Sequence, residues 1–146
     1  MESQQKPTAT PCLCYALRQA TRAVSRLYDE ELRGIGLRTT QFSLLQSVSR
    51  AGEVRQRDLG ALTSLEETTL TRSLRPLIVA RWVAIRPGQD RREKLIRLTD
   101  AGLAKLEEAR PAWERAQKRL RSRLPKQTWS SLLDLLPELT WLADRA

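Results

Sequence analysis

The sequence predicts a mainly α-helical domain with one small β-hairpin wing, a winged helix-turn-helix. Residues 65–78 place their leucines and isoleucine at helical spacing on one side, and threonine and arginine side chains on the other. Two short alternating segments follow at residues 82–86 and 94–98, and the link between them, residues 87–93, is turn-forming and basic. A helix with a polar, arginine-bearing face beside a basic hairpin suits the grooves of a nucleic-acid duplex.

The charge of the chain favours a polyanionic partner. Its 146 residues include 26 Lys and Arg against 17 Asp and Glu, which gives a formal net charge of +9 and a pI near 10.5. This balance favours nucleic acid over a membrane surface, although many basic proteins bind no nucleic acid, and the helix and hairpin favour double-stranded DNA. The sequence has no apolar run of about 20 residues and no signal-peptide pattern, so we expect a cytoplasmic protein without a membrane partner.

The residue types that most enzymes use are scarce. The chain has no histidine, which removes the commonest general base and metal ligand. Cys12 and Cys14 cannot form a zinc site alone, and the sequence contains no glycine-rich phosphate loop. We therefore expect a protein that is not an enzyme and that holds no metal or cofactor.

A flexible, polar N-terminal arm is expected over residues 1–10, and a single domain over residues 11–146. The winged helix occupies about residues 37–99 of this domain. Thr39 or Thr40 is placed to cap its first helix.

The second short helix of the winged helix is expected at about residues 55–62. It comes directly before a tight polar turn and the helix at residues 65–78, which is the expected recognition helix. One residue conflicts with a regular recognition helix. Pro76 lies inside it, where a proline removes a backbone hydrogen bond and should kink or shorten the helix.

Long amphipathic helices are expected on both sides of the winged helix, at about residues 12–33 and 100–145. Thr99 is placed to cap the first helix of the second region, and Pro111 and Pro137 are expected to bend or distort its helices. Three of the four tryptophans lie here: Trp113, Trp129 and Trp141. These apolar faces have little to pack against in one small domain, so we expect a homodimer; a role in a single core is the alternative.

Particular motifs identify a family. The segment from Asp90 to Gly102, DRREKLIRLTDAG, resembles the signature of MarR-family transcriptional regulators: an Asp-x-Arg wing tip, a strand, and Leu-Thr-x-x-Gly. Residues 68–77 resemble the recognition helix of that family, and residues 36–45 resemble its second helix. The similarity extends over nearly the whole chain beyond Thr10. It implies a homodimeric winged-helix repressor, or less often an activator, which binds a pseudo-palindromic operator and is released by a small ligand or by oxidation.

The wing tip carries an oriented arginine in this interpretation. Asp90 and Arg92 are two residues apart in an extended segment, so Asp90 can hold the guanidinium of Arg92 for insertion into a narrow minor groove. Arg91 is expected to contact phosphate. The alternative for the Asp90–Arg92 pair is an ordinary surface ion pair.

The remaining DNA contacts are expected from two helices. The recognition helix offers short polar and arginine side chains to the major groove: Thr68, Thr69, Thr71, Arg72 and Arg75. Arg55 and Arg57, at the start of the preceding helix, are expected to contact phosphates. The alternative function is a winged-helix module for protein–protein interaction without sequence-specific DNA binding, for which the Asp90-Arg-Arg92 tip would be unnecessary.

A thiol is one candidate sensor of the signal. Cys14 resembles the reactive cysteine near the start of the first helix in the hydroperoxide-sensing members of the family, and Tyr28 fits one of the tyrosines that bond it there. Arg18 and Thr39 depart from that pattern, although the positive charge of Arg18 one turn later would favour a thiolate. A disulfide between Cys12 and Cys14 would need local unwinding, so a bond to the other subunit, a mixed disulfide or a soft-metal site shared between subunits is easier geometrically. Both cysteines are otherwise small packing residues in a reducing compartment.

A small aromatic or anionic ligand is the other candidate signal. The family often binds such ligands between the first helix and the DNA-binding lobe. Arg18 and Arg22 could pair with an anion there, and Tyr15 and Phe42 could stack on its ring. The alternative for these arginines is a solvated helix face.

Overall fold

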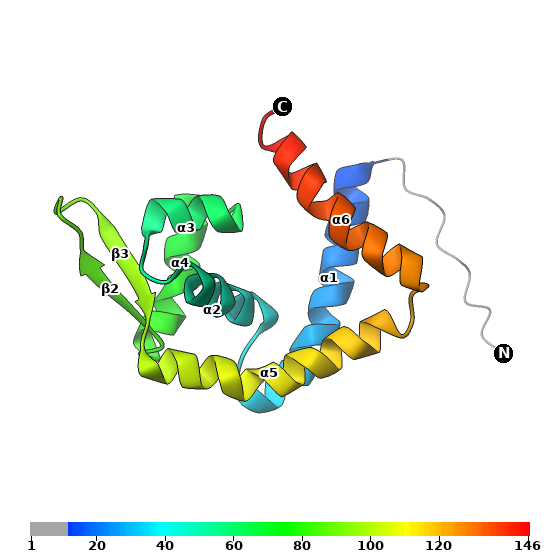
Figure 1. Ribbon diagram of the computed structural model, residues 1–146, viewed down its shortest axis with the longest axis horizontal. Helices are drawn as coiled ribbons and strands as arrows, with labels where there is room; N and C mark the ends of the chain where they lie inside the picture. Colours follow the sequence, from blue (N-terminus) through cyan, green and yellow to red (C-terminus); the bar gives the residue numbers. More distant parts are fainter. Residues whose placement is uncertain (1–11) are drawn as a thin grey trace.

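The computed structural model describes residues 12–146, so the arm expected over residues 1–10 lies outside the described residues. One long helix, α5, joins two groups of elements (Figure 1). A lobe of three helices and a small sheet lies at one end, and the helices α1 and α6 lie at the other. The fold is therefore the mainly helical winged helix with flanking helices that the sequence predicts.

The elements follow one another along the chain in the predicted order. Their bounds are α1 (Leu13–Leu32), the short 3-10 helix η1 (Arg33–Ile35), α2 (Thr39–Ala51), β1 (Val54–Arg55), α3 (Gln56–Thr63), α4 (Glu67–Val79), β2 (Val83–Pro87), β3 (Lys94–Leu98), α5 (Asp100–Arg121) and α6 (Lys126–Ala143). None of the helices within residues 12–146 combines the length and the apolarity that a bilayer span requires.

The sheet has three antiparallel strands in the order β1-β3-β2, whereas the sequence predicts only the β2–β3 hairpin. The added strand β1 pairs Val54 with Ile96 and consists of two residues, too short for an alternating pattern to mark it. Arg55 therefore lies in a strand. The expectation that α3 begins with this residue is wrong by one position, since α3 begins at Gln56.

The hydrophobic core is centred in the winged-helix lobe and extends to Leu32 of α1 and Leu106 of α5. Helices α2, α3 and α4 pack their apolar faces together and against the inner face of the sheet. The largest fully buried side chains are Leu32, Leu45, Val48, Leu59, Leu70, Leu74, Leu77 and Ile96. Each such side chain stabilises the fold by about 2 kcal/mol through the apolar surface that it removes from water. This core fixes α4 with one face inward and the opposite face exposed.

The start of α2 differs from the prediction. Neither Thr39 nor Thr40 caps the helix, because α2 already begins at Thr39. The backbone N–H of Thr39 donates to Asp29 Oδ1 at 2.6 Å, and the backbone N–H of Arg38 donates to the side chain of Gln41 at 2.9 Å. A carboxylate from α1 thus satisfies the helix start, which also suits the positive end of the helix dipole.

Pro76 lies inside α4 without ending it. The helix continues to Val79, and the backbone N–H of Ala80 still donates to the carbonyl of Pro76 at 3.0 Å. Because Pro76 lies in the last turn and is exposed, its ring removes only the hydrogen bond to the carbonyl of Arg72. The expectation that the proline shortens the recognition helix is therefore wrong.

The start of α5 is clamped to the turn that follows α4. Thr99 caps α5 as predicted, since its hydroxyl accepts from the backbone N–H of Gly102 at 3.0 Å. The same hydroxyl donates to the carbonyl of Arg81 at 2.6 Å, and the N–H of Thr99 donates to the carbonyl of Trp82 at 3.0 Å. Arg81 has a φ of 61°, a left-handed conformation that these bonds help to hold.

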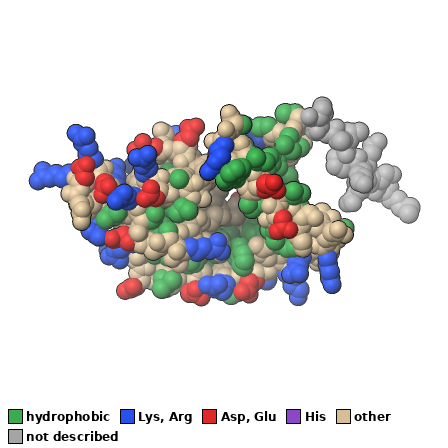
Figure 2. Space-filling model, turned by 45° about the horizontal axis from the view of Figure 1, so that its top comes forward, with side chains coloured by type: hydrophobic (Ala, Val, Ile, Leu, Met, Phe, Trp, Pro, Cys, Tyr) green, Lys and Arg blue, Asp and Glu red, His purple; other side chains and the backbone are tan. Residues whose placement is uncertain are grey.

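The long helix α5 also packs against α1, and it buries the small residues Ala109, Ala112 and Ala116. By contrast, the apolar faces of α1 and α6 are largely open. Leu32 is the only buried residue of α1, and no residue of α6 is buried. Hydrophobic side chains gather on this end of the surface (Figure 2). Pro111 and Pro137 lie inside α5 and α6, which continue past them.

The contact at Gly102 yields a stability prediction. A methyl group at this position would overlap the backbone carbonyl of Trp82, which cannot move without displacing the turn after α4. We expect Gly102→Ala to lower the free energy of unfolding by about 2 kcal/mol. Urea denaturation followed by circular dichroism measures this change.

Gly34→Ala is the matched control. A methyl group at Gly34 would meet no heavy atom within 4 Å, and the residue has no left-handed φ, so this variant should unfold within about 0.5 kcal/mol of the parent. Equal stability of the two variants would contradict the close approach at Trp82.

Candidate nucleic-acid interface

The turn between α3 and α4 is tight and sets the direction of α4. Ser64 adopts a left-handed φ of 52°, and the backbone N–H of Leu65 donates to the carbonyl of Gly60 at 3.0 Å. A methyl group on Gly60 would come within 3.1 Å of the Leu65 carbonyl, so glycine suits this close approach. The two helices therefore form a helix-turn-helix with a fixed angle.

The exposed face of α4 carries the residues predicted to enter the major groove. Leu70, Leu74 and Leu77 are buried against α2, α3 and the sheet. The opposite face exposes every predicted recognition residue: Thr68, Thr69, Thr71, Arg72 and Arg75. Among the described residues, neither arginine pairs with a carboxylate, so both guanidinium groups are available to bases or phosphates.

The wing tip is held by a different bond from the one predicted. Asp90 Oδ1 accepts from the backbone N–H of Arg92 at 3.0 Å, and no ion pair joins the two side chains in the described part of the chain. The turn is closed further by the N–H of Glu93, which donates to the carbonyl of Asp90 at 2.9 Å. Asp90 therefore fixes the backbone that carries Arg92. The guanidinium groups of Arg91 and Arg92 are exposed and have no acidic partner among residues 12–146.

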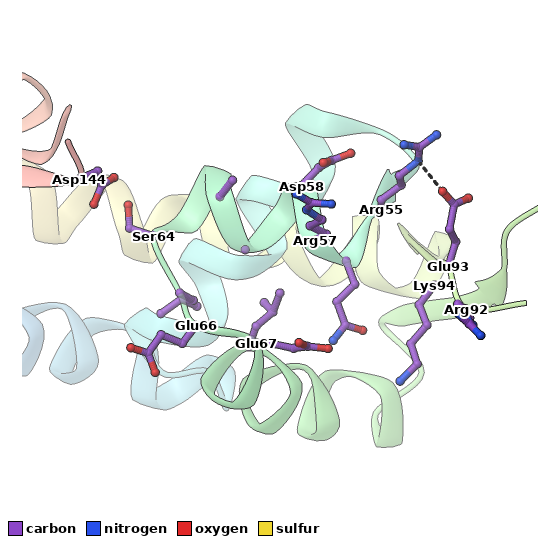
Figure 3. Close-up of a pocket in the computed structure, with 15 residues that line it drawn as sticks. Arg55, Arg57, Asp58, Ser64, Glu66, Glu67, Arg92, Glu93, Lys94 and Asp144 are labelled. Carbon is purple, nitrogen blue, oxygen red and sulfur yellow. Dashed lines mark ion pairs between the residues drawn. The ribbon is translucent and has the colours of Figure 1, made fainter. Parts of the chain in front are cut away.

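A groove of about 870 Å³ separates the wing from α3 and the start of α4 (Figure 3). Arg55 and Arg57 line it from one side, and Arg92 and Lys94 line it from the wing. Arg55 pairs with Glu93 at 3.4 Å, so this predicted phosphate contact is partly neutralised within the protein. Arg57 is exposed and has no acidic partner within residues 12–146.

Two further contacts support the interface, and no local sequence pattern marks them. Arg86 on β2 makes a bidentate ion pair with Glu53, with a distance of 2.8 Å from Nε to Oε2. The hydrogen bond from Arg86 holds the pKa of the Glu53 carboxyl below its usual value. Gln56, the first residue of α3, donates from Nε2 to the hydroxyl of Thr71 at 3.0 Å. In each of these two contacts the two residues are far apart in the sequence, so only folding of the chain brings them together.

The predicted sensing residues fall into separate places. Cys14, Arg18 and Arg22 line a groove of about 500 Å³ between α1 and α6, with Leu139 on the opposite wall. Cys12 is exposed. The groove therefore combines a thiol and two guanidinium groups with an apolar wall.

The predicted aromatic partners lie outside that groove. Phe42 is buried in the core and stacks on Trp113, with ring centroids 6.0 Å apart. Tyr15 is exposed, and its hydroxyl accepts from the side chain of Gln19. Burial raises the pKa of Tyr28.

Within residues 12–146, no three Cys, Asp or Glu side chains gather as a metal site would require.

The helix-turn-helix, the exposed polar face of α4 and the arginine-tipped hairpin beside it define the chain as a winged-helix DNA-binding protein. A model of the winged helix DNA-binding domain matches residues 37–102. YwoH of Bacillus subtilis (strain 168), an uncharacterized HTH-type transcriptional regulator, is 32% identical over 96 residues, which cover 66% of this chain and 70% of YwoH.

Solved structures agree. The M. tuberculosis transcriptional regulator MosR in complex with DNA is 33% identical, with a TM-score of 0.79 over 92% of this chain and 99% of that chain. A mutant MarR from E. coli complexed with operator DNA is 26% identical, with a TM-score of 0.78 over 87% and 92% of the two chains. The chain belongs to the MarR family of winged helix-turn-helix transcriptional regulators, as its sequence motifs predict.

The bond from Asp90 to the backbone of Arg92 makes a testable distinction. Asp90→Asn keeps an oxygen acceptor and should leave the hydrogen exchange of the Arg92 amide close to that of the parent. Asp90→Ala should speed this exchange about fivefold, because a hydrogen bond of about 1 kcal/mol is lost. Amide exchange followed by NMR measures both. Equal acceleration in the two variants would instead favour an ion pair that needs the carboxylate charge.

Proposed function

We propose that the protein is a homodimeric repressor of a pseudo-palindromic operator. In this proposal α4 enters the major groove, Arg92 enters the adjacent minor groove, and Arg57 and Arg91 contact phosphates. Within residues 12–146, the arginines of α4 and of the wing tip are exposed and make no ion pair, and this observation carries the proposal. The bonds of Thr99 hold α4 and the wing together. Relatives solved with DNA support the same use of the fold.

Binding to promoter fragments from the gene's neighbourhood tests the proposal. We expect saturable binding to a duplex that weakens steeply with salt. Arg92→Ala should weaken binding about tenfold, most strongly at sites with a narrow minor groove, and Arg57→Gln should lower the salt slope by about one. Fluorescence anisotropy at several salt concentrations measures both effects.

Arg123→Gln is the control for loss of one positive charge, because Arg123 is exposed beyond the end of α5, outside the winged-helix lobe. The alternative is a protein–protein interaction module. It would be favoured if the parent chain bound no duplex even at low salt.

The open face of α6 supports a homodimer. Leu132, Leu133, Leu136 and Trp141 are between 41% and 57% exposed. Exposed apolar side chains that gather on one surface are costly in water and commonly mark a site of association. A second copy of the chain would cover α6 and the open side of α1. It would also set two recognition helices about 34 Å apart, one turn of DNA.

Leu136→Asp should weaken dimerisation at least tenfold, because a charge would be buried in the paired surface. Leu103→Asp is the matched control, since Leu103 is similarly exposed but lies near the start of α5, beside the winged-helix lobe. Sedimentation equilibrium measures the association constant. A parent chain that is monomeric at micromolar concentration would contradict the proposed dimer.

Release of the operator is proposed to follow either oxidation of Cys14 or binding of a small aromatic or anionic ligand. The groove between α1 and α6 supports both, because it joins the Cys14 thiol to Arg18, Arg22 and the apolar side chain of Leu139. Phe42 is less suited to contact a ligand there, since it is buried against Trp113.

Cys14→Ser separates the two signals. It should abolish release of DNA by an organic hydroperoxide and leave release by an aromatic carboxylate unchanged, as measured by anisotropy of a bound promoter duplex. Cys12→Ser is the matched control, because the two exposed thiols are two residues apart. Oxidant release of Cys14→Ser at the parent's rate would eliminate the thiol signal.

A further inference from the structure

Gln56 is a buried amide that reaches into the recognition helix. The described residues hold one buried polar side chain, that of Gln56, which is 9% exposed. Its Nε2 donates to Oγ1 of Thr71 at 3.0 Å, although Thr71 itself is exposed on α4. A buried amide without a partner loses its hydrogen bonds to water and gains none in return, so loss of this bond is unfavourable.

The bond constrains what the Thr71 hydroxyl can do. A threonine hydroxyl has one hydrogen and two acceptor lone pairs. The Gln56 amide occupies a lone pair of Thr71, so the hydroxyl hydrogen must point elsewhere.

Other threonines of the chain use that hydrogen within their own helix. The hydroxyl of Thr63 donates to the carbonyl of Leu59 at 2.7 Å, and that of Thr140 donates to the carbonyl of Leu136 at 3.0 Å. Within the described residues, the hydroxyl of Thr71 donates to no protein group. Its hydrogen is therefore free for a partner on the exposed side of α4.

We propose that Gln56 is a positioning residue that makes Thr71 a hydrogen-bond donor toward a base in the major groove. The inference rests on the proposed function, in which α4 lies in that groove. Guanine, adenine N7 and thymine O4 present acceptors there, whereas the cytosine edge presents the N4 amino donor. Thr71 can thus donate to an acceptor edge at one position of each operator half-site, a bond that the cytosine amino group cannot accept.

A substitution that reverses the polarity of the bond tests this proposal. In Gln56→Glu the carboxylate can only accept, so the Thr71 hydrogen turns inward and its lone pairs face the groove. A lone pair accepts from cytosine N4 or adenine N6. Without the outward hydrogen, the preference at this position should shift from acceptor edges toward cytosine, whereas a purely structural role for Gln56 would leave base preference unchanged.

The experiment uses the full chain and the promoter duplex that the parent binds, with each base of the duplex randomised in turn. Sequencing of the bound fraction gives the preference at every position. Thr71→Val, which removes the donor, first identifies the position that Thr71 reads. At that position Gln56→Glu should raise the relative binding of cytosine about tenfold.

Two controls keep the result specific. Ala61→Glu adds the same charge to the exposed side of α3 without a contact to Thr71, and should weaken all sequences alike. Gln56→Met keeps the side-chain length but forms no bond to the hydroxyl, so it should relax the preference without reversing it. If Gln56→Glu does not fold, the base preference of Gln56→Met at the Thr71 position tests the proposal, and a relaxed preference is the expected result.

An unchanged preference at the Thr71 position in Gln56→Glu or Gln56→Met would overturn the inference while DNA binding by the parent upheld the proposed function. Failure of the parent to bind any duplex at low salt would instead remove the proposed function itself.

Discussion

The rest of the structure depends on the clamp between the start of α5 and the turn after α4. Thr99 bonds the carbonyls of Arg81 and Trp82 and also caps α5 at Gly102. Because the turn joins the recognition helix to the wing, these bonds fix the angle between the two elements proposed to read the two grooves. The absence of a side chain at Gly102 permits this approach. The Leu-Thr-x-x-Gly motif thus connects the start of α5 to the turn after α4.

From this turn, helix α5 extends to the other end of the molecule, where α1 and α6 lie (Figure 1). Arg115 pairs with Glu31 at 3.1 Å, and Arg119 pairs with Glu30 at 2.9 Å, so α5 is bonded to α1 as well. The groove that holds Cys14 lies between α1 and α6. Helix α5 thus contacts both the helix α1 that lines this groove and the turn after α4. This arrangement gives the proposed release a physical route.

Much of the interface could be predicted because its signals are local. The spacing of Leu70, Leu74 and Leu77 identifies the buried side of α4, and therefore the exposed threonines and arginines. The cap at Thr99 depends on residues three apart. By contrast, Asp29 rather than Thr39 satisfies the start of α2, because a carboxylate from α1 occupies that end of the helix. The Asp90 side chain accepts a hydrogen bond from the backbone of Arg92. The geometry of the turn determines this partner, and side-chain spacing does not reveal it.

The sequence by itself determined the order of the helices, the hairpin, the family and the side of α4 that faces outward, because each follows from periodicity or from motifs within a few residues. Only the tertiary structure decided the third strand, the Arg86–Glu53 pair and the bond from Gln56 to Thr71. These contacts join residues far apart in the chain, and their partners are chosen by packing. The direction in which the Thr71 hydroxyl donates is determined in the same way, by the side-chain amide of Gln56 on another helix.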